Sequence, residues 1–156
     1  MRKIFGLKMV EFARRDKNIF LISGDVEHEM EVFKKEFPDR YLNAGLCEQS
    51  MISMAAGMCS QGLRPYVYSI TPFLLERPYE QIKIDIDEHN LPVQLIGYAD
   101  YPTHGPTHRP LNAEILVKTF KNIKSHFPKN DLETAELMEK YFIKNIPSLL
   151  CLKKNP

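Results

Sequence analysis

The chain has 156 residues, of which 44% are hydrophobic and 26% are charged, and its formal net charge is +1. This length and composition are typical of one globular domain with a substantial core, so we expect a single domain over residues 1–156. The basic residues are scattered, which argues against a nucleic acid or a membrane surface as partner. No apolar run approaches the roughly 20 residues that span a bilayer, and the amino terminus carries no hydrophobic signal region. We therefore expect a cytoplasmic protein.

Helical and strand patterns alternate along the chain. Residues 2–16 carry apolar side chains at helical spacing, and the continuous apolar run 19–22 is typical of a strand buried on both faces. Residues 28–36 are predicted to be helical, with Pro38 ending the helix, and 41–43 is a short strand candidate.

The second half continues the alternation. A helix opens near Glu48, and Gly62 closes it, with Pro65 following in a usual stop arrangement. The remaining strands are predicted at 66–70, 93–97, 122–125 (weakly) and 148–152. The remaining helices are predicted at 73–89, 111–119 and 131–145, the last capped by Asp131. A loop rich in proline, histidine and threonine covers 98–110.

About six strands separated by helices predict a three-layer α/β/α domain with a mostly parallel sheet. Ligands bind such sheets beyond the carboxyl ends of the strands. Four segments with chemically interesting residues follow the predicted strands: Gly24-Asp25, Gly45 to Glu48, Ile70 to Phe73, and residues 98–108. We therefore expect one binding site at this edge of the sheet.

The most informative of these segments holds Glu48. It places one acidic side chain at the start of a helix whose other inward positions are apolar or very small. An ionised carboxylate in such surroundings is costly unless it is paired or protonated. The pattern favours a chemical role, and the alternative is a surface glutamate in the first turn of an amphipathic helix.

Several common site motifs are absent from the sequence. No G-x-G spacing, P-loop or H-E-x-x-H motif is present, and no Gly-Asp-Gly is followed by Asn-Asn. The three cysteines, Cys47, Cys59 and Cys151, lie in apolar stretches without C-x-x-C pairing, so we expect reduced core residues and no metal site. The sequence thus predicts no phosphate cradle of its own.

The loop around His104 and His108 is the second informative segment. Pro102, Pro106 and Pro110 restrict its backbone and would order the two imidazole rings in advance. The alternative is a pair of solvated loop histidines.

Four segments occur in an order that resembles one enzyme family. They are Gly45-x-x-Glu48-Gln49, Ala55-Ala56-Gly57, Asn90-Leu91-Pro92-Val93 and Gly105-Pro106-Thr107-His108. The chain resembles the pyrimidine-binding domain of transketolase-like thiamine diphosphate enzymes from about residue 3 to residue 156. The diphosphate-binding domain and the carboxy-terminal domain of that family have no counterpart, so the chain looks like one subunit of a split transketolase.

The resemblance implies specific roles in cofactor binding. Glu48 matches the glutamate that activates the cofactor, and Phe73 matches the aromatic residue that stacks on the aminopyrimidine, although a plain core position is the alternative. Ile70 stands where many relatives have a second aromatic residue, and Asp25 resembles an aspartate near the thiazole ring. Thiamine diphosphate would thus be shared with the partner, which would bind Mg²⁺.

The resemblance also implies substrate contacts. His108 matches a histidine that faces the sugar and the thiazolium, and it would assist proton transfer at substrate hydroxyl groups. His104 replaces a usual aspartate that helps to select the configuration of the sugar, which leaves the identity of the substrate open. Arg77 would meet a substrate phosphate, or else form a surface ion pair with Glu76 or Glu80.

The expected partners are a diphosphate-binding subunit, a sugar or sugar phosphate, and a second copy of this chain within an α2β2 complex. Self-association is expected through an apolar surface of the Glu48 helix, formed by Met51, Met54, Ala55, Met58 and Cys59. The expected activity is transfer of a two-carbon ketol unit. The alternatives are a split 2-oxo acid decarboxylase, a 1-deoxyxylulose-type synthase subunit, or a non-catalytic assembly or regulatory homologue.

Overall fold

The centre of the molecule is a parallel β-sheet. The computed structural model describes residues 1–98, 105–109 and 112–153. In this part of the chain six strands pair in the order β2-β1-β3-β4-β6-β5, and every neighbouring pair is parallel. The strands are β1 (Ile19–Ser23), β2 (Tyr41–Asn43), β3 (Arg64–Ile70), β4 (Gln94–Tyr98), β5 (Lys124–His126) and β6 (Ser148–Leu152).

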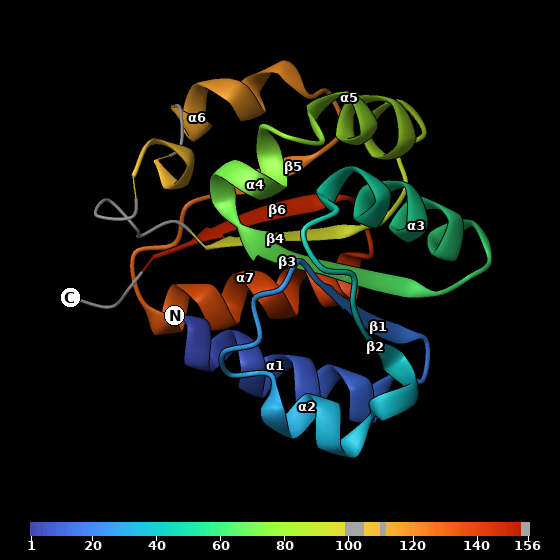
Figure 1. Ribbon diagram of the computed structural model, residues 1–156. Coiled ribbons are helices and arrows are strands. Elements are labelled where there is room, and N and C mark those ends of the chain that lie inside the picture. The colour runs from blue at the N-terminus through green and yellow to red at the C-terminus, as the bar shows by residue number, and fades with distance from the viewer. Residues whose placement is uncertain (99–104, 110–111, 154–156) are drawn as a thin grey trace.

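Helices cover both faces of this sheet (Figure 1). One layer holds α1 (Arg2–Arg15), α2 (Glu31–Glu36) and α7 (Asp131–Lys144). The other layer holds α3 (Glu48–Ser60), α4 (Thr71–Leu75), α5 (Tyr79–Gln81), the π-helix η2 (Ile82–Glu88) and α6 (Ala113–Leu116). Short 3₁₀ turns are η1 (Pro38–Arg40), η3 (Pro106–His108) and η4 (Val117–Thr119). The predicted three-layer α/β/α class is confirmed.

The core has two halves, one on each face of the sheet. Phe5, Phe12 and Tyr68 belong to the half under α1 and α7, whereas Ile52 and Leu74 belong to the half under α3 and α4. All residues of β4 and β6 are buried. This two-sided burial explains why these strands read as nearly continuous apolar runs.

The end of α3 follows the predicted stop signal. Gly62 has a φ of +86°, its N–H donates to the carbonyl of Cys59, and the N–H of Leu63 donates to the carbonyl of Met58. This pair of bonds is a Schellman motif, which satisfies carbonyl groups at the helix end and favours glycine for its left-handed conformation. The prediction that Gly62 closes the helix is confirmed.

Three local predictions are wrong. The predicted helix 73–89 divides into α4, α5 and η2, because Pro78 lacks an N–H and its ring clashes with a helical carbonyl. The N-cap of α7 is Asn130 rather than Asp131, and the Asn130 side chain accepts from the N–H of Glu133. The weak strand is displaced to 124–126.

The topology creates a switch point between β1 and β3. The chain passes from β1 through α2 to β2, which pairs with one edge of β1. It then crosses through α3, on the face of the sheet opposite to α2, to β3, which pairs with the other edge of β1. Loops therefore diverge at the carboxyl ends of β1 and β3, which is where ligands bind in open α/β sheets. Among the described residues, no helix has the length and apolar content needed to cross a bilayer.

Candidate functional site

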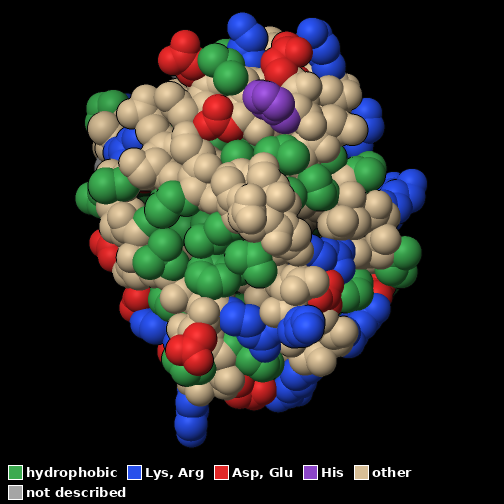
Figure 2. All heavy atoms as spheres, turned by 90° about the vertical axis from the view of Figure 1, so that its right-hand side faces the viewer, with side chains coloured by type: hydrophobic (Ala, Val, Ile, Leu, Met, Phe, Trp, Pro, Cys, Tyr) green, Lys and Arg blue, Asp and Glu red, His purple; other side chains and the backbone are tan. Residues whose placement is uncertain are grey.

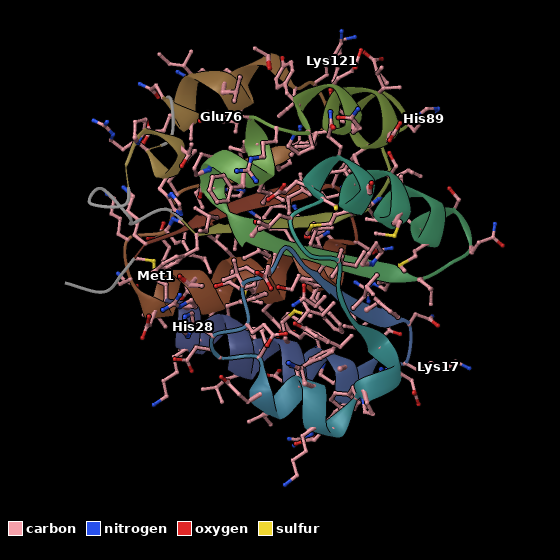
Figure 3. The ribbon with its side chains drawn as sticks, viewed as in Figure 1. Met1, Lys17, His28, Glu76, His89 and Lys121 are labelled. Carbon is pink, nitrogen blue, oxygen red and sulfur yellow. The ribbon has the colours of Figure 1, made fainter. Side chains whose placement is uncertain are left out.

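The carboxyl ends of the strands carry most of the predicted site residues. Figure 3 shows labelled residues from two segments at this edge, His28 from the loop after β1 and Glu76 from the turn after α4. The predicted Asp25 follows β1, Glu48 begins the helix after β2, and Phe73 lies in the helix after β3. His104 lies outside the described residues.

A tight turn after β2 delivers Glu48 to this edge. The side chain of Asn43 accepts a hydrogen bond of 2.9 Å from the N–H of Gly45, and Gly45 adopts a φ of +67° that other residues rarely take. The chain then enters α3, whose first residue is Glu48. Glu48 is 3% exposed, so the glutamate is buried rather than on the surface.

Arg77 is the partner of this buried carboxylate. Its Nη1 donates to Oε1 and Oε2 of Glu48 at 2.9 and 3.1 Å. The first-turn position in α3 also favours a negative charge, because the unpaired N–H groups of a helix start carry partial positive charge. A pocket of about 530 Å³ lies at this point, lined by Arg77 and by the residues from Leu46 to Ser50.

This ion pair overturns the alternative given for Arg77, a surface pair with Glu76 or Glu80, because Arg77 pairs with Glu48 instead. Residues 48 and 77 come from different elements, so helical spacing could not reveal the contact. No substrate phosphate is needed to explain where the Arg77 side chain lies.

Two aromatic contacts extend the site from Arg77 to His108. The guanidinium carbon Cζ of Arg77 lies 3.7 Å from the centroid of the Phe73 ring. The His108 ring meets Phe73 edge-on, with centroids 4.9 Å apart and planes at 67°. His108 also interacts with Thr107 through Nδ1, at 3.1 Å from Oγ1. Glu48, Arg77, Phe73 and His108 thus form one connected group.

A second pocket, of about 540 Å³, lies on the other side of His108. His108, Ile70 and Asp25 line it together with Val26, Glu27, His28 and Glu31. Asp25 has a φ of 59°, and its Oδ1 accepts from Nδ2 of Asn43 at 3.2 Å. The structure therefore brings Asp25, Ile70 and His108 to one pocket, which borders the group around Glu48.

Two further residues at this edge, Glu27 and Asn43, were not selected from the sequence. Nδ2 of Asn43 donates to Glu27 at 3.1 Å, and the hydroxyl of Tyr41 donates to the same carboxylate at 3.1 Å. Hydrogen bonding to Lys34 is the main cause that lowers the pKa of Glu27. Burial raises the pKa of Tyr41 to about 12. In the sequence, the polar run after the first strand was the only indication of Glu27, and nothing there singled out Asn43.

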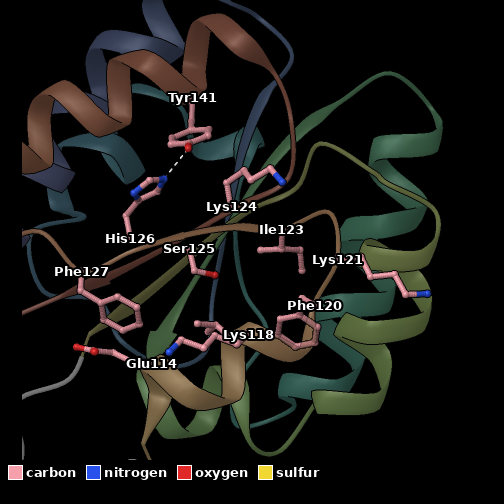
Figure 4. Close-up of a pocket in the computed structure, with 11 residues that line it drawn as sticks. Glu114, Lys118, Phe120, Lys121, Ile123, Lys124, Ser125, His126, Phe127 and Tyr141 are labelled. Carbon is pink, nitrogen blue, oxygen red and sulfur yellow. Dashed lines mark hydrogen bonds between the residues drawn. The ribbon is translucent and has the colours of Figure 1, made fainter.

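Another pocket, of about 500 Å³, lies at the far edge of the sheet beside β5 (Figure 4). Among the described residues, none of the predicted site residues lines it. His126 and Tyr141 are joined there by a hydrogen bond of 2.5 Å, and burial is the main cause that lowers the pKa of His126. Lys118, Lys121 and Lys124 also line this pocket.

The surface of α3 differs from the expected apolar interface. Met51 and Ala55 are fully buried in the core, so they offer no surface to a second copy. Met54, Met58 and Cys59 remain partly exposed. Figure 2 shows the side of the molecule on which α3 ends. Hydrophobic side chains gather just left of the centre of this face. The expectation of three core cysteines is also wrong, because Cys47 is exposed and Cys59 is half-buried.

This chain resembles part of several longer curated proteins. A 1-deoxy-D-xylulose-5-phosphate synthase of Halothermothrix orenii is 33% identical over 145 residues, which cover 87% of this chain and 22% of that protein. An apulose-4-phosphate transketolase subunit of Actinobacillus succinogenes is 34% identical over 110 residues, which cover 69% of this chain and 35% of that protein. The chain thus spans well under half the length of these relatives.

Solved structures share the fold. A split-gene transketolase, described as an inactive beta4 tetramer, superposes with a TM-score of 0.88 at 23% identity and covers 99% of this chain and 51% of that one. Transketolase from Campylobacter jejuni gives a TM-score of 0.87 at 18% identity and covers 97% and 25% of the two chains. A family model for the pyrimidine-binding domain of transketolase matches residues 1–156. The chain therefore belongs to the transketolase pyrimidine-binding domain family, whose members are thiamine diphosphate-dependent enzymes.

Proposed function

We propose that this chain is the pyrimidine-binding part of a split thiamine diphosphate-dependent transketolase. It would transfer a two-carbon ketol unit between sugars or sugar phosphates together with a separate diphosphate-binding subunit. Support comes from the family match and from the apulose-4-phosphate transketolase subunit that the chain resembles. The observation that carries the proposal is the buried carboxylate of Glu48, which is linked to the ring of Phe73 through their shared contact with Arg77.

The residues at this site fit the pyrimidine half of the cofactor. The guanidinium of Arg77 is a flat group with N–H donors, and the site already holds it between the Phe73 ring and the Glu48 carboxylate. A flat, N–H-bearing heterocycle has the same requirements, namely an aromatic face and a carboxylate acceptor. The diphosphate and Mg²⁺ are assigned to the partner, because the sequence has no phosphate-binding motif.

In the proposed mechanism the cofactor supplies the electron sink for breaking and forming the carbon–carbon bond, and this chain supplies orientation and proton control. Glu48 would hold a proton against a ring nitrogen of the aminopyrimidine. Phe73 would stack on this ring, while Ile70 and Asp25, which line the second pocket, would hold the thiazole part of the cofactor. Burial of Glu48 keeps water from competing for that proton.

Substrate contacts are assigned to the loop after β4. His108 lies between Phe73 and the second pocket, so it can exchange a proton with a substrate hydroxyl group in that pocket. His104 is proposed to help select the sugar. We further propose that two copies of this chain and two of the partner form the working complex.

A second activity has its own support, because the chain also resembles 1-deoxy-D-xylulose-5-phosphate synthases. Such an enzyme, or a split 2-oxo acid decarboxylase, would use the same site on a 2-oxo acid. A non-catalytic assembly or regulatory homologue is the third candidate, and it would keep the fold without turnover.

The test is co-expression with a diphosphate-binding subunit encoded nearby, followed by assays of ketol transfer and of carbon dioxide release from pyruvate. Ketol transfer supports the main proposal, carbon dioxide release supports the alternative enzymes, and a stable complex without either supports the non-catalytic role. Glu48→Gln should preserve folding and complex formation but lower turnover by a factor of about 10² to 10⁴. Exposed Glu80 provides the matched control, and Glu80→Gln should retain wild-type turnover.

A further inference from the structure

The side chain of Arg77 lies in the candidate site although 42% of it is exposed. It starts from the turn at 76–78 between α4 and α5. Its Nη1 donates to both oxygens of Glu48 at 2.9 and 3.1 Å, and its Cζ lies 3.7 Å from the centroid of Phe73. A long, hydrated side chain therefore turns inward and contacts two buried groups.

Both contacted groups are the ones that the proposed function assigns to the aminopyrimidine. Phe73 is only 7% exposed, and the His108 ring already meets it at a centroid distance of 4.9 Å. Little of the Phe73 ring is left for another flat group while Arg77 covers it. The guanidinium and a bound pyrimidine would therefore compete for the same aromatic face and the same carboxylate.

We propose that Arg77 is an internal stand-in for the pyrimidine ring, which occupies Phe73 and Glu48 until the cofactor displaces it. This inference rests on the proposed function, since that function makes the pocket a pyrimidine site. A guanidinium is planar, stacks on aromatic faces and donates N–H groups to carboxylates, so one pocket suits both groups. Because Arg77 lies in a turn and is itself exposed, its side chain can rotate into solvent without movement of a helix.

The two effects of Arg77 have opposite signs. In the unliganded chain it stabilises the fold, because a buried carboxylate without a partner is costly. Toward a flat ligand it lowers the affinity, because the binding-competent state is populated only when the guanidinium has left. An arginine with a purely structural role would affect stability and leave ligand affinity unchanged.

The experiment is an NMR titration of the full chain with two probes, 4-amino-5-hydroxymethyl-2-methylpyrimidine and methylguanidinium. Arg77→Ala should bind both probes about tenfold more tightly than wild type. Glu48→Gln added to Arg77→Ala should abolish this gain. Arg14→Ala is the matched control, since Arg14 pairs with Glu36 on the surface at 2.6 Å, and it should bind like wild type. If Arg77→Ala does not fold, Arg77→Lys keeps a charge without the flat group and should show part of the gain.

The two probes separate this inference from the proposed function. Tighter binding of both probes supports both proposals. Tighter binding of methylguanidinium alone would show only that the vacated guanidinium position refills, and it overturns the stand-in role. Equal or weaker binding of both probes by the Arg77 variants, compared with wild type, overturns the stand-in role. If wild type binds the pyrimidine well in that case, the proposed function survives.

Discussion

Replacing Asp87 should strongly destabilise the chain, although this residue lies outside the candidate site. Asp87 is 2% exposed and belongs to η2. Its Oδ1 accepts from the N–H groups of Asn122 and Ile123 at 2.8 and 3.0 Å, and its Oδ2 accepts from the N–H of Lys121 at 2.9 Å. One carboxylate therefore satisfies three consecutive N–H groups in the segment that leads into β5.

The cost of Asp87→Ala can be estimated from these bonds. The N–H of Ile123 is buried, and leaving it unsatisfied costs about 2 kcal/mol, while the two half-buried N–H groups cost about 0.5–1 kcal/mol each because water can reach them. The sum is about 3–4 kcal/mol, or roughly 10 °C in melting temperature for a chain of this length. Asp87→Asn keeps one oxygen that accepts two of the bonds, so it should cost about 1–2 kcal/mol.

Urea unfolding followed by circular dichroism measures these losses. Hydrogen exchange provides a second readout, since the amides of residues 121–123 should exchange faster than in wild type. Glu88→Ala is the neighbouring control, because the pair of Glu88 with Lys121 at 3.2 Å is exposed and contributes less than about 1 kcal/mol. If Asp87→Ala loses no more stability than Glu88→Ala, the carboxylate does not hold this segment and the reasoning is refuted.

Three further predictions concern stability. Gly6→Ala would place a Cβ 2.2 Å from the carbonyl oxygen of Glu29 and should destabilise the chain by about 1–3 kcal/mol. Gly57→Ala, in open space within α3, should stabilise it by about 0.5–1 kcal/mol. Urea unfolding that gives both changes the same sign would contradict this. The pKa of His126 is lowered in the folded state, so as the pH falls the unfolded chain takes up a proton at His126 before the folded chain does. Between pH 7.5 and 5.5 the wild type should therefore lose more stability than His126→Gln, and parallel curves of stability against pH would refute this. Ala55→Arg should unfold the chain, because Ala55 is fully buried; a folded protein by circular dichroism and light scattering would place it on a surface instead.

The fold class could be predicted from the sequence because its signals are local or periodic. Strands buried on both faces must be apolar at successive positions, as in β1 and β6, and this pattern is visible without any contact information. The end of α3 was also predictable, since Gly62 adopts a left-handed conformation that favours glycine. The order of elements then implied a parallel sheet with a site at its carboxyl edge.

Local sequence patterns did not predict the structure where two neighbouring residues could both cap a helix, or where a helix face could be buried either in the core or in an interface. Asn130 and Asp131 are both good capping residues, and the backbone conformation at Asn130 decides between them. The small residues of α3 suit either an interface or a core, and packing against the sheet buries Ala55. Helical periodicity shows that one face of a helix is apolar, but it does not predict what covers that face.

The alternating elements, the family resemblance, and the selection of Glu48, Phe73 and His108 all followed from the amino-acid sequence. The pairing of Arg77 with Glu48 and its position over Phe73 did not, because this contact spans 29 positions of the chain and depends on tertiary packing. The physical reason is that a buried charge needs a partner, but burial does not specify which element supplies it. That choice depends on where the turn after α4 lies relative to the start of α3, and this relation exists only once the sheet has formed.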